Sequence, residues 1–209
     1  MARTVDPAKH EAKRAQIMTA AYRCFAQKGF AATTTADICR AAGMSTGNLF
    51  HYFPSKRAIF SAIFEEDTKK TALRLRQAAI SEDPWGGLLE YLAHTLHEAA
   101  DPGAGGFLIA VIAQAQQDPE FAAQLGRNDT VQLEGLTALL VRAAELGQTD
   151  RLLEPGVAAT WLAVILDGAF VRLAGNPDVK PLEQLPALTL LVSRFLGAEV
   201  REDPLVIDG

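Results

Sequence analysis

Residues 33–56 read TTTADICRAAGMSTGNLFHYFPSK, a pattern of two very short helices separated by a glycine. Any of the three threonines can cap the first free amides of a helix through ADICRAA, and Gly43 can end that helix because glycine tolerates a left-handed backbone. Ser45 is placed to cap a second helix, which must be brief because Pro54 disfavours helical geometry at the preceding residue. Ser55 offers a cap for a third, longer helix. Two short helices joined by a glycine-containing turn predict a helix-turn-helix, whose second helix enters the major groove of DNA.

Helical periodicity assigns two faces to the second short helix. Leu49 and Phe53 lie four residues apart and should face inward with Ile38. The other side chains are then shared between the groove and the DNA backbone; they are Ser45, Thr46, Gly47, Asn48, Phe50, His51 and Tyr52.

The outward residues differ in the DNA contact that their chemistry favours. Asn48 is the best reader of a base because its amide can pair bidentately with adenine. Gly47 contributes through its missing side chain, which lets the helix backbone approach the duplex closely. Phosphate contacts, which position a protein without specifying a sequence, are assigned to Thr34, Ser45, His51, Tyr52 and Lys56.

At these residues the chain resembles the TetR (tetracycline-repressor) family of bacterial transcriptional regulators. The resemblance is carried by the helix ending AAGMS, the recognition helix STGNLFHYF and the sequence PSKRAIF that opens the next helix. One difference is Phe50, where family members often have Tyr, so a phenol-to-phosphate bond there is either absent or made by Tyr52. The resemblance implies DNA contacts at Thr34, Ser45, Thr46, Gly47, Asn48, Phe50, His51, Tyr52 and Lys56.

The two parts of the chain carry opposite net charge. Residues 1–60 hold nine Lys and Arg against three Asp and Glu, a net charge of +6, whereas residues 61–209 hold 11 against 22. A basic head on an acidic body is typical of a protein that binds nucleic acid at one end. Chance clustering of charges on solvated faces would give the same pattern, but it would not explain the helix-turn-helix.

The rest of the chain consists of helix patterns separated by Pro and Gly, without an alternating pattern long enough to indicate a strand. With 209 residues, 49% of them hydrophobic, it can bury one large or two modest cores. We predict an all-α fold of about nine helices, with a three-helix DNA-binding domain at residues 1–54 and a helical effector-binding and dimerisation domain at residues 55–209. Outside the two short helices, the expected helices cover residues 9–27, 55–80, 83–99, 105–117, 118–146, 155–174 and 181–197, the first of them closed by Gly29.

Two features bear on the compartment in which the protein works. The apolar run at residues 155–166 is too short to cross a bilayer and is followed by Asp167, so we predict a buried helix and no membrane partner. The basic N-terminus is not followed by an apolar stretch and is no secretory signal, which indicates a cytoplasmic protein. Cys24 and Cys39 fit apolar helix faces, and we interpret them as buried structural thiols rather than as a redox switch.

The two C-terminal helices, at residues 155–174 and 181–197, carry more apolar side chains than the edge of a monomer needs. Such helices can pair with their twins across a two-fold axis, and the resemblance implies the same, a dimeric four-helix bundle. A homodimer would read a palindrome whose half-sites lie about 34 Å apart. The alternative is that these helices belong only to an internal core.

A small-molecule site is the feature that the sequence indicates least clearly. Apolar walls with few polar anchors are typical of such sites, and the body helices can supply them. The candidate lining residues are Phe64, Tyr91, Leu92, Phe107, Val111, Gln114, Leu136 and Trp161, although each of them also fits an ordinary core.

No metal, cofactor or catalytic site is predicted. His94 and His97 lie one turn apart, but no further His or Cys is placed to complete a metal site. No nucleophile, base and orienting residue occur together at a suggestive spacing, so an enzyme is the least favoured interpretation.

The sequence thus predicts a one-component transcriptional regulator, and specifically a repressor. A homodimer would bind a palindromic double-stranded DNA operator, and a small apolar or amphipathic effector bound in the body would lower its affinity for DNA. The helix at residues 55–80 would act as a lever that transmits the effect of ligand binding in the body to the DNA-binding domain. The alternative is a DNA-binding protein of the same fold whose body binds a protein partner instead of a small ligand.

Overall fold

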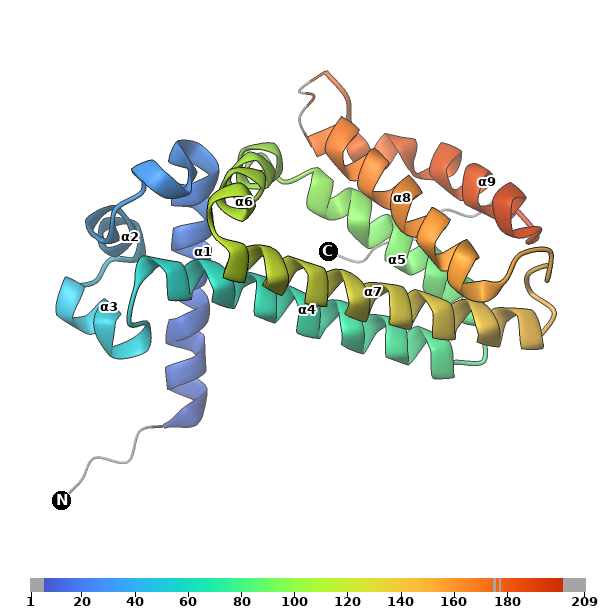
Figure 1. Ribbon diagram of the computed structural model, residues 1–209, viewed down its shortest axis with the longest axis horizontal. Coiled ribbons are helices and arrows are strands. Elements are labelled where there is room, and N and C mark those ends of the chain that lie inside the picture. The colour runs from blue at the N-terminus through green and yellow to red at the C-terminus, as the bar shows by residue number, and fades with distance from the viewer. Residues whose placement is uncertain (1–5, 175, 177, 201–209) are drawn as a thin grey trace. The chain divides into compact units, whose positions relative to one another are not determined.

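The computed structural model describes residues 6–174, 176 and 178–200 (Figure 1). Nine α-helices, one short 3-10 helix and no strand occur in that part of the chain, which confirms the all-α fold class. The helices are α1 (Pro7–Ala32), α2 (Thr35–Ala42), α3 (Thr46–Tyr52), α4 (Lys56–Ile80), α5 (Pro84–Ala99), α6 (Ala104–Gln117), α7 (Pro119–Glu145), α8 (Pro155–Ala174), the 3-10 helix η1 (Pro181–Gln184) and α9 (Leu185–Leu196).

The helices form two compact units, each built from two separate segments of the chain. The first unit contains the described residues up to Asp67 together with Gly105–Leu125. The second unit contains Thr68–Ala104 and the described residues from Gly126 onward. This division differs from the predicted boundary after residue 54, because α6 and the first turns of α7 share a core with α1 to α4.

Helix α1 is interrupted near its C-terminus. Asp6 caps its start by accepting from the backbone N of Ala8 at 3.1 Å. Gly29 breaks the helical geometry with φ 76° and ψ 166°, a backbone that glycine adopts at little cost. The regular helix therefore ends at Gly29, as predicted, and the short helical turn that follows it to Ala32 is a separate stretch beyond the kink.

Two of the three threonines at the start of α2 have different structural roles. Thr34 is the cap: its Oγ1 accepts from the backbone N of Asp37 at 3.1 Å, and Asp37 Oδ2 accepts from the backbone N of Thr34 at 3.0 Å. Thr33 is buried, and its hydroxyl donates to the carbonyls of Cys24 and Gly29 at 3.1 and 2.7 Å. Thr33 therefore satisfies carbonyl groups where the kink interrupts the α1 ladder.

The other predicted turn signals are confirmed. Gly43 ends α2 with φ 64° and ψ 43°, in the left-handed region. Ser45 caps α3, its Oγ accepting from the backbone N of Asn48 at 3.3 Å. Ser55 Oγ accepts from the backbone N of Ala58 at 3.0 Å at the start of α4. Residues 33–56 thus form the predicted helix-turn-helix.

The core of the first unit is organised around the ring of Phe60, at the start of α4. Phe60 is 1% exposed, and its ring centroid lies 4.9 to 5.6 Å from those of five other phenylalanines. Offset and edge-to-face arrangements at such distances are the favourable ones for aromatic rings. The five neighbours come from α1, α4, α6 and α7, and they are Phe25, Phe30, Phe64, Phe107 and Phe121.

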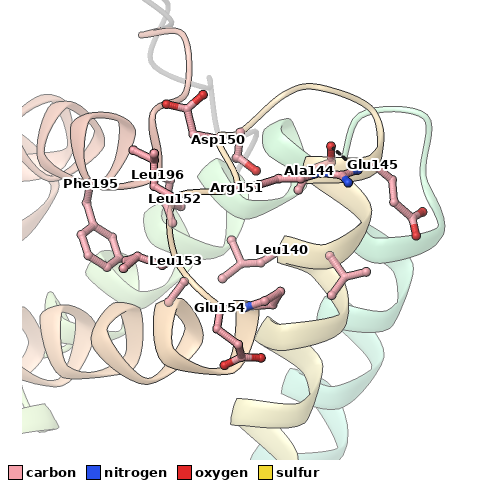
Figure 2. Close-up of a pocket in the computed structure, with 14 residues that line it drawn as sticks. Leu140, Ala144, Glu145, Asp150, Arg151, Leu152, Leu153, Glu154, Phe195 and Leu196 are labelled. Carbon is pink, nitrogen blue, oxygen red and sulfur yellow. Dashed lines mark hydrogen bonds between the residues drawn. The ribbon is translucent and has the colours of Figure 1, made fainter.

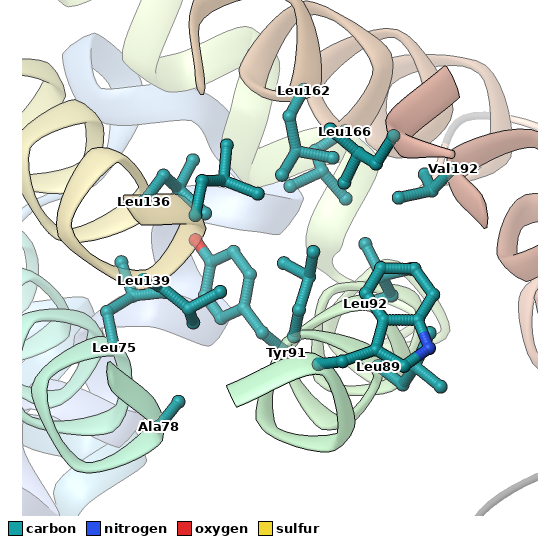
Figure 3. Packing of buried hydrophobic residues seen from close by; sticks show 14 of the residues in the cluster. Leu75, Ala78, Leu89, Tyr91, Leu92, Leu136, Leu139, Leu162, Leu166 and Val192 are labelled. Atoms are coloured by element: carbon teal, nitrogen blue, oxygen red, sulfur yellow. The ribbon is translucent and has the colours of Figure 1, made fainter. Parts of the chain in front are cut away.

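The core of the second unit is built on α5, which contacts α8, η1 and α9. Figure 3 shows Tyr91 and Leu92 of α5 among apolar side chains from α4, α7, α8 and α9. Tyr91 is 5% exposed, and its phenol oxygen accepts from Gln132 Nε2 of α7 at 3.1 Å, so the polar atom of this core residue has a partner.

Helix α8 is not the buried helix that its apolar sequence predicts. Within the described residues it is the one helix whose length and hydropathy would allow it to cross a membrane, yet only 28% of its most apolar window is buried. Its buried residues lie on one face, toward the second core: Ala158, Ala159, Leu162, Ala163 and Leu166. The prediction failed because composition does not reveal whether one face or all faces of a helix are covered.

Candidate nucleic-acid interface

The outward face of α3 is open. Leu49, Phe53 and Ile38 are at most 2% exposed, which confirms the inward face predicted from periodicity. Phe50 is 47% exposed although it is a large apolar side chain. The exposed residues at this helix are Ser45, Thr46, Gly47, Asn48, Phe50 and His51.

Gly47 has no structural reason to be glycine. Its φ is not positive, and a Cβ added to it would meet no atom within 4 Å. An internal packing contact or a strained turn therefore does not require glycine at this position, whereas close approach of the helix to another molecule does favour it. The Asn48 side chain lies beside it on the exposed face.

Helix α1 holds the ends of α2 and α3 through side chains that the sequence alone did not single out. Arg14 Nη1 donates to the carbonyl of Tyr52 at 3.0 Å, and the guanidinium lies 4.2 Å from the ring centroid of Phe53. Gln16 Nε2 donates to the carbonyl of Ala42 at 2.8 Å. These contacts satisfy carbonyl groups at the C-terminal ends of the two short helices.

The same side of α1 carries His10 against the aromatic end of α3. The ring centroid of His10 lies 4.9 Å from that of Tyr52 and 6.4 Å from that of His51. The sequence does contain a signal for these contacts. His10, Arg14 and the buried Ile17 are spaced by four and three residues, so they lie on the same face of α1. Tyr52 is accordingly half-buried rather than fully exposed.

Thr34, a predicted phosphate ligand, is engaged within the chain. Its Oγ1 donates to Asp37 Oδ2 at 2.8 Å in addition to capping α2. Lys28 Nζ lies 2.8 Å from Asp37 Oδ1, and the hydrogen bonds from Lys28 and Thr34 hold the pKa of the Asp37 carboxyl well below its usual range. This carboxylate therefore remains charged and keeps the start of α2 in place at any physiological pH.

Lys56 is also engaged within the chain, at the end of α1. Its Nζ donates to the carbonyls of Phe30 and Thr33 at 2.6 and 2.7 Å and to that of Ala31 at 3.4 Å. The ammonium lies 4.4 Å from the ring centroid of Phe30, and partial burial lowers the pKa of Lys56. Two of these carbonyls belong to the kinked end of α1 and the third to Thr33, which follows it, so Lys56 fixes the first turn of α4 to that end.

Arg57, the next residue, is paired with two carboxylates of the α6 to α7 junction. Its Nε and Nη2 donate to Asp118 at 2.6 and 2.8 Å, and Nη2 also donates to Glu120 at 3.0 Å. The guanidinium lowers the pKa of Asp118 to about 2. Asp118 also accepts from Gln114 Nε2 at 3.1 Å, so this predicted effector-site amide already has a partner. The pairing makes Arg57 a less available phosphate ligand than its position suggests.

The eight predicted effector residues fall in two groups, one in each unit. In the first unit Phe64 and Phe107 stack with ring centroids 5.5 Å apart, and Val111 and Gln114 follow on α6. In the second unit Tyr91, Leu92 and Leu136 are packed together in the core (Figure 3), whereas Trp161 is 56% exposed. None of the eight lines the cavity of the second unit described below.

Most of the chain is similar to known regulators. Residues 17–63 match the family described as "Bacterial regulatory proteins, tetR family", and residues 85–198 match "BetI-type transcriptional repressor, C-terminal". The chain is 28% identical over 172 residues to the HTH-type transcriptional repressor AcnR of Corynebacterium efficiens, which covers 82% of this chain and 87% of that protein. It is 27% identical over 185 residues to the HTH-type transcriptional regulator UidR of Escherichia coli, covering 88% and 93%.

A solved structure supports the same fold. The complex of SmeT, a repressor from Stenotrophomonas maltophilia, with triclosan matches at a TM-score of 0.74 and 23% identity, over 93% of this chain and 95% of that chain. At this identity the likeness shows a shared arrangement of helices and no more.

We expect Lys56→Met to lower the free energy of unfolding by about 1–3 kcal/mol, because the carbonyls at the end of α1 lose their donor while the apolar stem is retained. Urea denaturation followed by circular dichroism measures this change. Lys69→Met is the control, since Lys69 is exposed on the same helix. Unchanged stability of Lys56→Met, with a loss of DNA binding alone, would instead assign Lys56 to a phosphate.

Proposed function

This chain belongs to the TetR family of bacterial regulatory proteins and is a DNA-binding transcriptional regulator, and on that basis we propose that it is a repressor that binds a palindromic operator as a homodimer. A small apolar or amphipathic effector, bound by the body, would release it from the DNA. We place the protein in the cytoplasm, where its DNA target is accessible.

The observation that carries this proposal is the exposed face of α3. Asn48 and Gly47 are neighbours on α3, whose C-terminal end is held by Arg14 of α1, while Gln16 of α1 holds the end of the preceding helix α2. The helix thus presents an amide, and beside it a residue without a side chain that allows close backbone approach. We assign base reading to Asn48, and phosphate contacts to Ser45, Thr46, His51 and Tyr52. Thr34 and Lys56 are engaged within the chain, and their contribution to DNA binding is mainly to position α2 and α4.

An apolar stripe on α8 supports the homodimer. Val157, Trp161, Val164 and Val171 are 46% to 56% exposed and follow one another at helical spacing along one face. Leu190 and Leu191 of α9 are 46% and 53% exposed. Exposed apolar surface arranged in this way marks an interaction site, and pairing with a second copy would bury it symmetrically.

The chain's own connectivity supports coupling between effector and operator. α4 begins beside the helix-turn-helix in the first unit and continues into the second. SmeT, which has the same fold, forms a complex with the small apolar molecule triclosan, so this helical framework can accommodate such a ligand. We propose that an effector near Phe64 and Phe107, or near Tyr91 and Leu92, would favour a conformation with the two recognition helices poorly spaced for successive grooves.

We expect Asn48→Ala to weaken operator binding by about 1–3 kcal/mol and to reduce the preference for the operator over unrelated DNA, because the base-reading amide is lost. Fluorescence anisotropy with cognate and scrambled duplexes, at one salt concentration, measures both effects. Gln116→Ala, which removes an exposed amide of α6, serves as the control. A specificity ratio that stays at the wild-type value would show that Asn48 does not read a base.

An effector should lower the affinity for the DNA that flanks the protein's own gene. The same anisotropy assay, repeated with triclosan and a panel of other small apolar compounds, tests this expectation. A compound that binds the protein should weaken the complex by about 5- to 150-fold, the usual range for coupling between two sites. If effector-saturated and effector-free protein bind DNA equally, the two sites are not coupled.

We expect Trp161→Lys to give monomers at concentrations at which the wild-type protein is a dimer, because a charge would be buried in an apolar interface. Sedimentation velocity measures the oligomeric state. Leu73→Lys is the matched control, since Leu73 has the same exposed fraction of 56% but lies on α4. Loss of the dimer in both variants, or in neither, would argue against an interface centred on α8.

A further inference from the structure

A cavity of about 460 Å³ opens in the second unit beside the loop that joins α7 to α8 (Figure 2). The last turns of α7, the loop, the first turn of α8 and the end of α9 surround it. Its volume lies within the usual range for small-molecule sites. The lining residues are Leu140, Val141, Ala144, Glu145, Thr149, Asp150, Arg151, Leu152, Leu153, Glu154, Pro155, Ala158, Phe195 and Leu196.

The loop is fixed to all three helices, so the cavity is formed before anything binds. The backbone N of Asp150 donates to the carbonyl of Leu196 in α9 at 2.9 Å. Arg151 Nη2 donates to the carbonyl of Ala144 in α7 at 3.2 Å, and Glu154 Oε2 accepts from a backbone N in the first turn of α8 at 2.9 Å. A preformed site loses little conformational entropy on binding, which favours affinity for a small ligand.

The walls of the cavity are mainly apolar. Leu140 and Ala158 are 4% and 6% exposed and belong to the second core, while Leu153 and Phe195 face the cavity from the loop and from α9 (Figure 2). Leu152 is 85% exposed, more than any other large hydrophobic side chain in the described residues. An occupant with an apolar body would remove part of this surface from water.

The charged groups at the cavity are net negative. Three carboxylates, those of Glu145, Asp150 and Glu154, line it together with the guanidinium of Arg151. Glu145 is also paired with Arg142 at 3.1 Å, which leaves a net charge of −1. The guanidinium of Arg151 already donates to the carbonyl of Ala144, which leaves it less able to bind an anion. The C-terminal ends of α7 and α9 also meet here and carry partial negative charge, whereas the N-terminal end of α8, with its partial positive charge, is capped by the carboxylate of Glu154.

We propose that this cavity binds a small organic cation whose charge is carried on an apolar body. The leucine and phenylalanine side chains contact the body, and the carboxylates and helix C-termini stabilise the charge. An anion does not match the negative charge of the site, and a strongly hydrated metal ion does not match its apolar walls. All residues of the site belong to the second unit. The proposed binding therefore does not depend on whether the ligand alters operator affinity.

Tetraphenylphosphonium and tetraphenylborate form a matched pair of probes, because they share size and shape and carry opposite charge. We expect isothermal titration calorimetry of the full chain, without DNA, to show binding of the phosphonium and at least about tenfold weaker binding of the borate, as electrostatic complementarity requires. Equal binding of both ions, tighter binding of the borate or no binding of the phosphonium would overturn the proposal.

Two variants locate the bound cation. Ala144→Phe fills the cavity from α7 and should abolish phosphonium binding, with circular dichroism confirming the fold. The double variant Glu145→Gln and Asp150→Asn should weaken it about tenfold by removing two charges, with little effect on packing. The double variant Glu90→Gln and Glu134→Gln removes two exposed carboxylates outside the cavity and should change binding less than about twofold. A wild-type affinity in Ala144→Phe, or equal losses in the two double variants, would place the cation elsewhere on the surface.

Discussion

The aromatic contacts of Phe60 are the interaction on which the first unit depends. This one ring joins α1, α4, α6 and α7 in a single core, and the helix-turn-helix is attached to the same helices through Arg14, Gln16 and Lys56. The recognition helix itself has only seven residues, too few to be stable in isolation. Its position is therefore determined by the Arg14 contact at its C-terminal end and by the core beneath it, rather than by its own hydrogen bonds.

Local signals in the sequence were sufficient for the helix-turn-helix. Capping hydroxyl groups, a left-handed glycine and a proline act within a few residues, so Gly43, Ser45 and Pro54 could be interpreted without tertiary information. The contacts that the sequence did not reveal join distant residues: Lys56 binds carbonyls 23 to 26 residues earlier, and Arg57 binds a carboxylate 61 residues later. No periodicity encodes such pairs. The inward face of α3 and a threonine cap for α2 were predictable, but the internal engagement of Lys56 was not.

The net charge of the DNA-binding unit could not be obtained from the N-terminal sequence alone. Split at residue 60, the chain has a basic head with a net charge of +6. The residues of the first compact unit, however, carry nine Lys and Arg against eight Asp and Glu, because α4 and the α6 to α7 junction add carboxylates. Arg57 is neutralised by two of them, and Asp37 pairs with both Lys28 and Arg40. The positive charge available to DNA is therefore smaller than the sequence count.

The discontinuity of the first unit has a consequence for the order of events during protein synthesis. When the ribosome has made residues up to Asp67, the nascent chain contains the helix-turn-helix but not Phe107 or Phe121, two of the rings that surround Phe60. At about 5–20 residues per second, several seconds pass before residue 125 is added. During that interval Phe60 and Phe64 lack the contacts with Phe107 and Phe121, so part of their apolar surface is left uncovered in the nascent DNA-binding segment. The DNA-reading end of this protein is translated first, yet it completes its folding only after more than half of the chain exists.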